Sequence, residues 1–167
     1  MKRKRFIQSC AGITGAALIT PNFIHASSGK ELFNTDLIDE FVLAAHRDLD
    51  QTKKLIDNHP LILNCTSQIR RGDFETAIGG ASHMGREDIA QLLVERGARL
   101  DIFNLCFLGY TEVVKQLIEI SPNYLTAYGP HGFTLLHHAK MGEQHEFASW
   151  LQDKGLKEDI FDSIFVK

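Results

Sequence analysis

Four segments of this chain repeat one apolar pattern, and this repetition limits the possible fold more than any other feature of the sequence. In each segment the repeated side chains recur at positions i, i+3 and i+4, a spacing that lines one face of an α-helix. A shorter run of small and apolar residues precedes each segment, and Asp48, Gly85, Gly109 or Gly142 lies in the turn between the two. The repeated unit is therefore expected to be helix–turn–helix. The four sets are Thr52/Leu55/Ile56, Ile89/Leu92/Leu93, Val114/Leu117/Ile118 and Phe147/Trp150/Leu151.

A single pair of helices cannot bury its apolar face, whereas stacked neighbours share a continuous core. The sequence therefore predicts an all-α solenoid of about four helix–turn–helix units over residues 35–158. Short fingers are expected to project around residues 64–75 and 125–133. The shorter helices are expected over residues 41–46, 77–84, 103–108 and 135–141, and a helix starting near Asn34 or Thr35 is expected to cover the first unit.

Residues at the predicted helix ends agree with this division. The run Asp48-Leu49-Asp50-Gln51 has the pattern of a capping box. Thr76 and Thr134 each precede an apolar run, where a hydroxyl can accept from free backbone N–H groups. Gly97 and Gly155 follow the second helices, where a residue with positive φ commonly ends a helix.

One motif resembles a known repeat family. The run Thr134-Leu135-Leu136-His137-His138-Ala139 resembles the ankyrin-repeat motif Thr-Pro-Leu-His-x-Ala, and Thr76-Ala77-Ile78-Gly79-Gly80-Ala81 is a weaker copy, with Gly79 in place of the family histidine. The resemblance covers roughly residues 36–157, and it implies that His137 forms a hydrogen bond between neighbouring units. The repeat residues that it implies are Thr76, Ala81, Gly85, Gly97, Thr134, His137, Ala139 and Gly142.

The two ends of the chain are expected to lie outside the repeats. Residues 1–26 have the layout of an export signal, with a basic start, a weakly apolar stretch and a small residue, Ala26, before the expected cut. The start resembles the bacterial twin-arginine signal, with Lys4 where the second arginine belongs, so general secretion is an open route. Residues 27–34 are predicted to be a linker and 159–167 a short helix that caps the last unit. The expected location is the bacterial periplasm, with a cytoplasmic protein as the alternative.

Composition excludes several classes of partner. The net charge is −3, and no Lys/Arg block occurs beyond the first five residues, which argues against nucleic acid. No apolar run approaches the roughly 20 residues of a spanning helix, so no membrane span is expected in the mature form. Three cysteines are too few for a disulfide framework. The mature protein is predicted to be a monomer.

No catalytic, metal-binding or cofactor-binding motif stands out, and the protein is predicted to be non-catalytic, without metal or cofactor. A nucleophile paired with a base, a serine elbow and a phosphate-binding glycine loop are all missing from the sequence. The rival hypothesis is a small metal- or thiol-dependent protein that uses His131, His138, Cys65 and Cys106.

Recognition of another protein is the remaining function, and the resemblance implies that finger tips and the concave face carry it. Arginine and aromatic residues supply most of the binding energy in protein interfaces. For Phe74 and Phe133, packing between the fingers is the alternative role. The candidate partner-binding residues are Arg70, Arg71, Phe74, Tyr128, His131 and Phe133.

Overall fold

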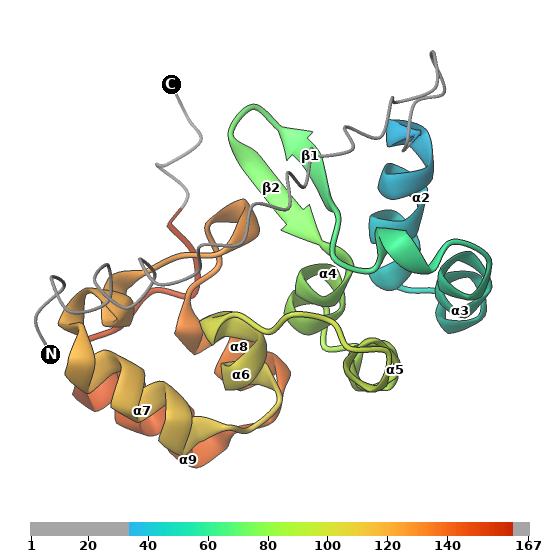
Figure 1. Cartoon of the computed structure of the whole chain (residues 1–167). Helices are drawn as coiled ribbons and strands as arrows, with labels where there is room; N and C mark the ends of the chain where they lie inside the picture. Colours follow the sequence, from blue (N-terminus) through green and yellow to red (C-terminus); the bar gives the residue numbers. More distant parts are fainter. Residues whose placement is uncertain (1–33, 162–167) are drawn as a thin grey trace, which may run out of the picture. The chain divides into compact units, whose positions relative to one another are not determined.

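The structure, a computed structural model, describes residues 34–161, which form helix pairs and one small β-hairpin (Figure 1). The predicted export signal, most of the linker and the last six residues of the tail lie outside the described residues. The described part is mostly helical, as predicted. Its α-helices are α2 (Thr35–Ala45), α3 (Leu49–Asn58), α4 (Ala77–His83), α5 (Glu87–Glu95), α6 (Ile102–Phe107), α7 (Thr111–Ile120), α8 (Leu135–Met141) and α9 (His145–Asp153). Its 3₁₀ helices are η1 (Pro60–Ile62), η2 (Pro122–Thr126) and η3 (Pro130–Gly132).

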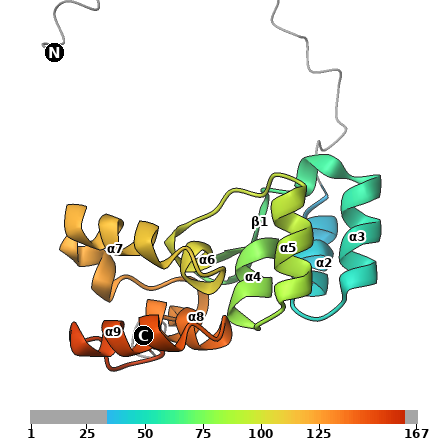
Figure 2. The same ribbon diagram turned by 90° about the horizontal axis from the view of Figure 1, so that it is seen from below.

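The helices pack as consecutive antiparallel neighbours. Each odd-numbered helix packs on the even-numbered helix before it, as the helix–turn–helix pattern predicts. The even-numbered helices also contact one another in chain order, from α2 to α4, α6 and α8, and α8 reaches back to α4 (Figures 1 and 2). Helix α2 begins at Thr35, where a helix start is expected, because Asn34 caps it by accepting from the Asp36 N–H, and it runs without a break into the predicted segment 41–46.

Two groups of buried side chains make up the core. One is built from α2 to α5 with Phe107, and the other from α6 to α9. Each repeated set contributes buried residues to these groups, while Leu92, Leu117 and Trp150 are only half-buried. Trp150 stacks on Phe147 at the edge of the second group. The ammonium groups of Lys115 and Lys154 lie over its ring, 5.7 and 5.4 Å from the centroid.

The helix ends follow the predicted local rules with one exception. The Thr76 and Thr134 side chains cap α4 and α8. Asp48 accepts from the Gln51 N–H, but the Gln51 side chain donates to Glu40 instead of closing the capping box. At the predicted turn residue Gly142 φ is −88°, and the positive φ of this turn lies at the next residue, Glu143, where φ is 56°.

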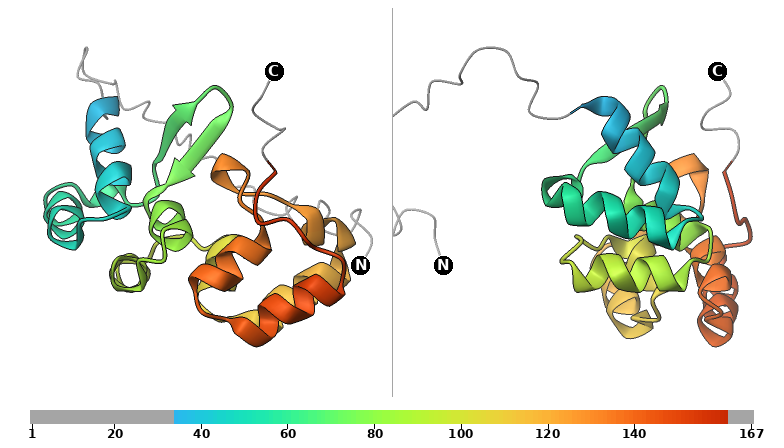
Figure 3. Two further views of the ribbon diagram at one scale, coloured as in Figure 1. Left: turned by 180° about the vertical axis from the view of Figure 1, so that it is seen from behind. Right: turned by 90° about the vertical axis from the view of Figure 1, so that its right-hand side faces the viewer.

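The β-hairpin is the feature that the all-α prediction missed. Strands β1 (Thr66–Arg70) and β2 (Asp73–Thr76) pair in antiparallel register, with Ser67 opposite Glu75, and Gly72 turns the chain between them with φ of 79°. The hairpin projects from the start of α4 (Figures 1 and 3). The burial along β2 is inverted, because Asp73 and Glu75 are buried while Phe74 is exposed. The strands were missed because their polar composition does not show an apolar alternation.

The described part of the predicted C-terminal cap is extended rather than helical. Ile160 pairs with Phe133, and the Phe161 N–H donates to the Gly132 carbonyl. The hydroxyl of Thr134 donates to the Glu158 carbonyl at 2.7 Å. These backbone bonds to the turn before α8 hold the segment extended, so the prediction of a helix is wrong for residues 159–161.

Across residues 34–161, no helix has the length and apolar character needed to cross a bilayer.

Candidate functional site

The two predicted fingers lie side by side because one buried carboxylate joins them. Asp73, at the start of β2, accepts a hydrogen bond from the backbone N–H of His131 at 3.0 Å. Its other oxygen lies 3.1 Å from Nδ1 of His131 and 3.0 Å from Nε of Arg70. Asp73 therefore anchors the turn around η3 to the hairpin.

A surface groove is lined by residues 71–74 of the first finger and residues 128–130 of the second. Phe74 and Tyr128 line it and are 56% and 48% exposed. Arg71 lies on the same groove. Three of the six predicted partner-binding residues are therefore brought together. The other groove residues are Gly72, Asp73, Asp101, Phe103, Gly129 and Pro130.

The remaining three predicted residues have other neighbours. Arg70 is ion-paired with Asp73. Phe133 stacks on the ring of His137 with centroids 3.9 Å apart, which supports the packing role considered for it. His131 turns its ring inward, toward Glu75.

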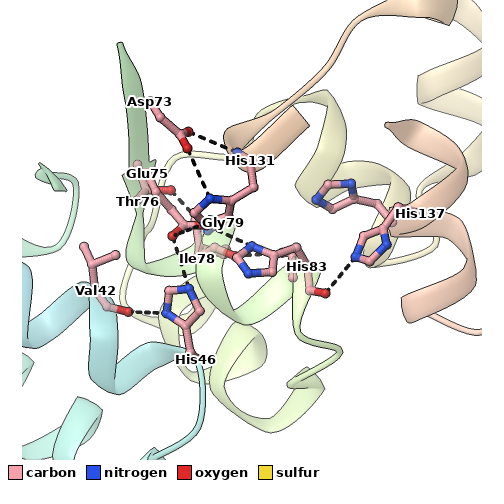
Figure 4. A network of polar contacts seen from close by, with 12 residues as sticks. Val42, His46, Asp73, Glu75, Thr76, Ile78, Gly79, His83, His131 and His137 are labelled. Atoms are coloured by element: carbon pink, nitrogen blue, oxygen red, sulfur yellow. Dashed lines mark hydrogen bonds and ion pairs between the residues drawn. The ribbon is translucent and has the colours of Figure 1, made fainter. Parts of the chain in front are cut away.

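That inward turn completes a group of four side chains from four different elements. We call His46, Glu75, His83 and His131 the histidine–glutamate cluster (Figure 4). His46 follows α2, Glu75 lies on β2, His83 ends α4, and His131 lies in η3. One nitrogen or oxygen from each side chain can be chosen so that all four lie within 4.8 Å of one another.

Glu75 is at the centre of the cluster. Its side chain is fully buried, and its oxygens lie 3.2 Å from Nε2 of His46, 2.8 Å from Nδ1 of His83 and 3.5 Å from Nε2 of His131. These short distances are not aligned hydrogen bonds, because neither carboxylate oxygen has a partner in hydrogen-bond geometry. Burial alone would raise the pKa of Glu75, but the neighbouring imidazoles of His46 and His83 outweigh it and hold the pKa at about 2.

His46 is oriented from behind by the helix that it follows. Its Nδ1 lies 2.7 Å from the Val42 carbonyl oxygen, which directs Nε2 toward Glu75 (Figure 4). Burial lowers the pKa of His46, but the Glu75 carboxylate and the Val42 carbonyl raise it more, so that the pKa lies above its usual value. Its ring is edge-on to that of His83, with centroids 4.9 Å apart.

Glycines in α4 make room for the cluster. A Cβ atom on Gly80 would lie 2.7 Å from Cε1 of His46, and one on Gly79 would lie 3.2 Å from the Thr76 hydroxyl and 3.5 Å from Cγ of Glu75. Gly79 is the residue that replaces the family histidine in the weaker motif copy. The close approach to the cluster is at Gly80, whereas at Gly79 the tightest contact is with the Thr76 hydroxyl that caps α4.

His137 forms an inter-helix hydrogen bond, but it does not join neighbouring units as the resemblance implies. Its Nε2 lies 2.9 Å from the backbone carbonyl oxygen of His83, so α8 is joined to α4. The bond reaches past α6, the first helix of the preceding pair. It also fixes the backbone of a cluster residue (Figure 4).

The residues of the rival hypothesis are not brought together. Cys106 is buried with its thiol donating to the Leu135 carbonyl, and His138 is buried with Nδ1 2.8 Å from the Thr134 carbonyl. Cys65 is a half-buried free thiol near Leu61. Within residues 34–161 the histidine–glutamate cluster is the one group with ligand spacing, and His131 is the one residue that it shares with the rival set.

Sequence reasoning missed His46, Glu75 and His83. They are spread from residue 46 to residue 83 in no recognisable metal-ligand spacing, and they meet His131 only in the folded chain. One local signal was available in Asp73-Phe74-Glu75, because two acidic residues alternating with an aromatic one on a strand place both carboxylates on one face.

Comparisons with known proteins return no matching family model and no matching curated protein.

Proposed function

We propose that this protein is a non-catalytic recognition module, an ankyrin-like stack of about four helix pairs that binds another protein through the groove between the hairpin and the η3 turn. The single observation that carries the proposal is the exposure of Phe74 and Tyr128, together with Arg71, on one groove. Aromatic and arginine side chains of this kind supply most of the binding energy in protein interfaces.

Three observations support an ankyrin-like stack. The first helices of the pairs contact one another in chain order. Thr76 and Thr134 cap α4 and α8 at the motif threonines, and His137 bonds a backbone carbonyl of another pair. In such a stack each pair contacts mainly its neighbours, and the loops form an extended binding surface.

Anchoring of the two fingers favours tight recognition. Asp73 holds the η3 turn to the hairpin through a backbone hydrogen bond and the His131 ring. Side chains that are held in place before binding lose less freedom on association, so more of the contact energy remains as affinity.

The buried thiol of Cys106 does not favour covalent catalysis at that residue. The Cys106 thiol is buried, and burial raises its pKa well above its ordinary value. A thiol of this kind stays protonated at neutral pH and is a poor nucleophile.

The test is a pull-down with the full chain, comparing the wild type with a Phe74→Ala/Tyr128→Ala double variant. We expect recovery of the bound protein to fall at least about tenfold, because each truncation removes a hot-spot type of contact. Tyr110→Ala is the matched control, since Tyr110 is 50% exposed but lies outside the groove. Thermal unfolding of both variants should stay close to the wild type, because exposed positions contribute little to stability. Equal recovery from the double variant and the wild type would refute the groove as the contact surface.

We further propose that the protein is exported to the periplasm by its N-terminal signal and acts there as a monomer; a cytoplasmic adaptor is the alternative. Export with cleavage after Ala26 predicts an intact mass that lacks residues 1–26. The mass of protein isolated from its native host distinguishes the two locations, because a cytoplasmic adaptor keeps these residues.

A further inference from the structure

We propose that His46, Glu75, His83 and His131 bind one divalent first-row transition-metal ion, with Zn²⁺ as the fitting example, and that this ion joins four elements of the fold. This inference goes beyond recognition of a partner and does not depend on it. It also departs from the sequence prediction that the protein holds no metal.

The spacing of the four side chains matches what a small metal ion requires. Zinc bonds of 2.0–2.1 Å in a tetrahedron place the donor atoms about 3.3 Å apart. In the cluster, the three histidine nitrogens lie 2.8, 3.2 and 3.5 Å from the oxygens of Glu75. Since all four donors lie within 4.8 Å of one another, small rotations of the side chains bring them to bonding distance of one ion.

The buried carboxylate at the centre of the cluster is the strongest support for an ion there, because its contacts with the imidazoles are short without being aligned hydrogen bonds. Glu75 is 1% exposed, and neither of its oxygens accepts an aligned hydrogen bond. Burying a carboxylate is very unfavourable unless the charge is paired or coordinates a metal. Figure 4 shows the imidazole rings placed around Glu75, with nitrogens of His46 and His83 facing its oxygens, and an ion bound between them would be shared by all four side chains.

The contacts behind two of the three rings, those of His46 and His131, are those of metal-bound histidines. A metal-ligating histidine usually donates its other N–H to a carbonyl or carboxylate, which fixes the ring. Nδ1 of His46 lies 2.7 Å from the Val42 carbonyl oxygen, and Nδ1 of His131 lies 3.1 Å from a carboxylate oxygen of the buried Asp73. In both residues Nε2 is left to face Glu75.

The backbone at His131 is consistent with a ligand clamp. His131 has φ of 61°, in the left-handed region that a residue with a Cβ seldom adopts. Such strained residues are concentrated at ligand clamps and active sites. The Asp73 carboxylate holds the strained residue by accepting from its backbone N–H.

The donor set selects the class of metal. Three imidazoles and one carboxylate suit zinc and its first-row neighbours, whereas Ca²⁺ and Mg²⁺ prefer sites built from oxygen. Four protein ligands fill a tetrahedral zinc ion, so the site is structural rather than catalytic. The four ligands come from different elements: His46 follows α2, Glu75 lies on β2, His83 is the last residue of α4 and His131 lies in η3. The ion would therefore link the hairpin and the η3 turn to two helices.

The experiment uses the full chain, stripped with a chelator and titrated with ZnCl₂. We expect one Zn²⁺ per chain by native mass spectrometry and a rise in melting temperature of about 5 °C or more at saturation, because the ion binds the folded state alone. The X-ray absorption spectrum of the bound zinc should show nitrogen and oxygen neighbours and no sulfur.

Two variants and a control make the test specific. His131→Asn removes one ligand but keeps a residue type that tolerates positive φ, so the turn should still fold. It should weaken zinc binding at least about 100-fold, and Glu75→Gln should do the same. His145→Gln, at an exposed histidine outside the cluster, should bind zinc as the wild type does.

Three results would overturn the proposal. They are the absence of stoichiometric zinc in the wild type, wild-type affinity in a folded His131→Asn variant, and sulfur among the zinc neighbours. Circular dichroism of each variant establishes that it is folded. If Glu75→Gln does not fold, His131→Asn decides the outcome.

Discussion

Replacing Gly142 by alanine is expected to lower the free energy of unfolding by about 3 kcal/mol or more. A Cβ atom at this position would lie far inside van der Waals contact with the carbonyl oxygen of Phe107, 2.8 Å from its carbonyl carbon and 3.0 Å from its Cα. These are backbone atoms at the end of α6, so they cannot move aside as a flexible side chain does. The φ of Gly142 is −88°, which alanine adopts freely, and the whole effect is therefore steric.

Gly97→Ala is the matched control for this prediction. Gly97 has φ of 87°, and a Cβ atom added there would have nothing within 4 Å, so alanine meets backbone strain without a collision. The expected loss is about 1–2 kcal/mol. Urea unfolding at neutral pH measures both values. A loss for Gly142→Ala no larger than that for Gly97→Ala would show that α6 and α8 do not approach as closely as described.

The second large effect is a loss of stability in acid that comes from His138. Burial lowers the pKa of this histidine to about 3, against an ordinary value of 6.5. The charged forms of His137 and His83 lower it further, while the Thr134 carbonyl and the Glu75 carboxylate oppose the shift. The folded protein therefore keeps His138 neutral over a range of pH in which the unfolded chain binds a proton there.

The sign of the effect follows from that difference in proton binding. Because the unfolded state binds the extra proton, stability falls as pH drops below about 6.5, and it stops falling near pH 3, where the folded form is also protonated. At pH 5 the contribution of this residue amounts to about 2 kcal/mol less stability than at pH 8.

A pair of variants isolates the contribution of His138. His138→Gln removes the titrating group, so its free energy of unfolding should change about 2 kcal/mol less between pH 8 and pH 5 than that of the wild type. His59→Gln, at an exposed histidine, should keep the wild-type dependence. Urea unfolding with a chelator present at both pH values gives the comparison. Equal slopes for His138→Gln and the wild type would contradict a buried neutral imidazole.

Much of the helical part could be predicted because its signals are local. The i, i+3, i+4 sets place apolar side chains on one face of each second helix, and Thr76 and Thr134 cap helices at the positions expected. The start of α2 and the positive φ of Gly97 follow in the same way from nearby residues. The hairpin and the extended segment after residue 158 could not be predicted from nearby residues. The extended segment, for example, is held by pairing with a distant residue, Phe133.

Of the two candidate sites, the groove could be predicted in part from the sequence and the histidine–glutamate cluster could not. Phe74, Tyr128 and Arg71 were identified from residue type and position in the fingers, and the fold places them on one groove. The sequence groups His131 with His138, Cys65 and Cys106, whereas the fold places it with the other three residues of the histidine–glutamate cluster. His138 and Cys106 lie nearer to it in sequence than His46 does, yet their side chains bond to neighbouring carbonyls instead.

By itself, the sequence determined the helical periods, the capped ends and the turns, because each depends on interactions within a few residues of the backbone. Only the tertiary structure decided that Glu75 is buried without an aligned partner and that three imidazoles from separate elements surround it. The physical reason is that burial and convergence depend on how helices and hairpin pack, since side chains as far apart as His46 and His131 meet only after their supporting elements have docked.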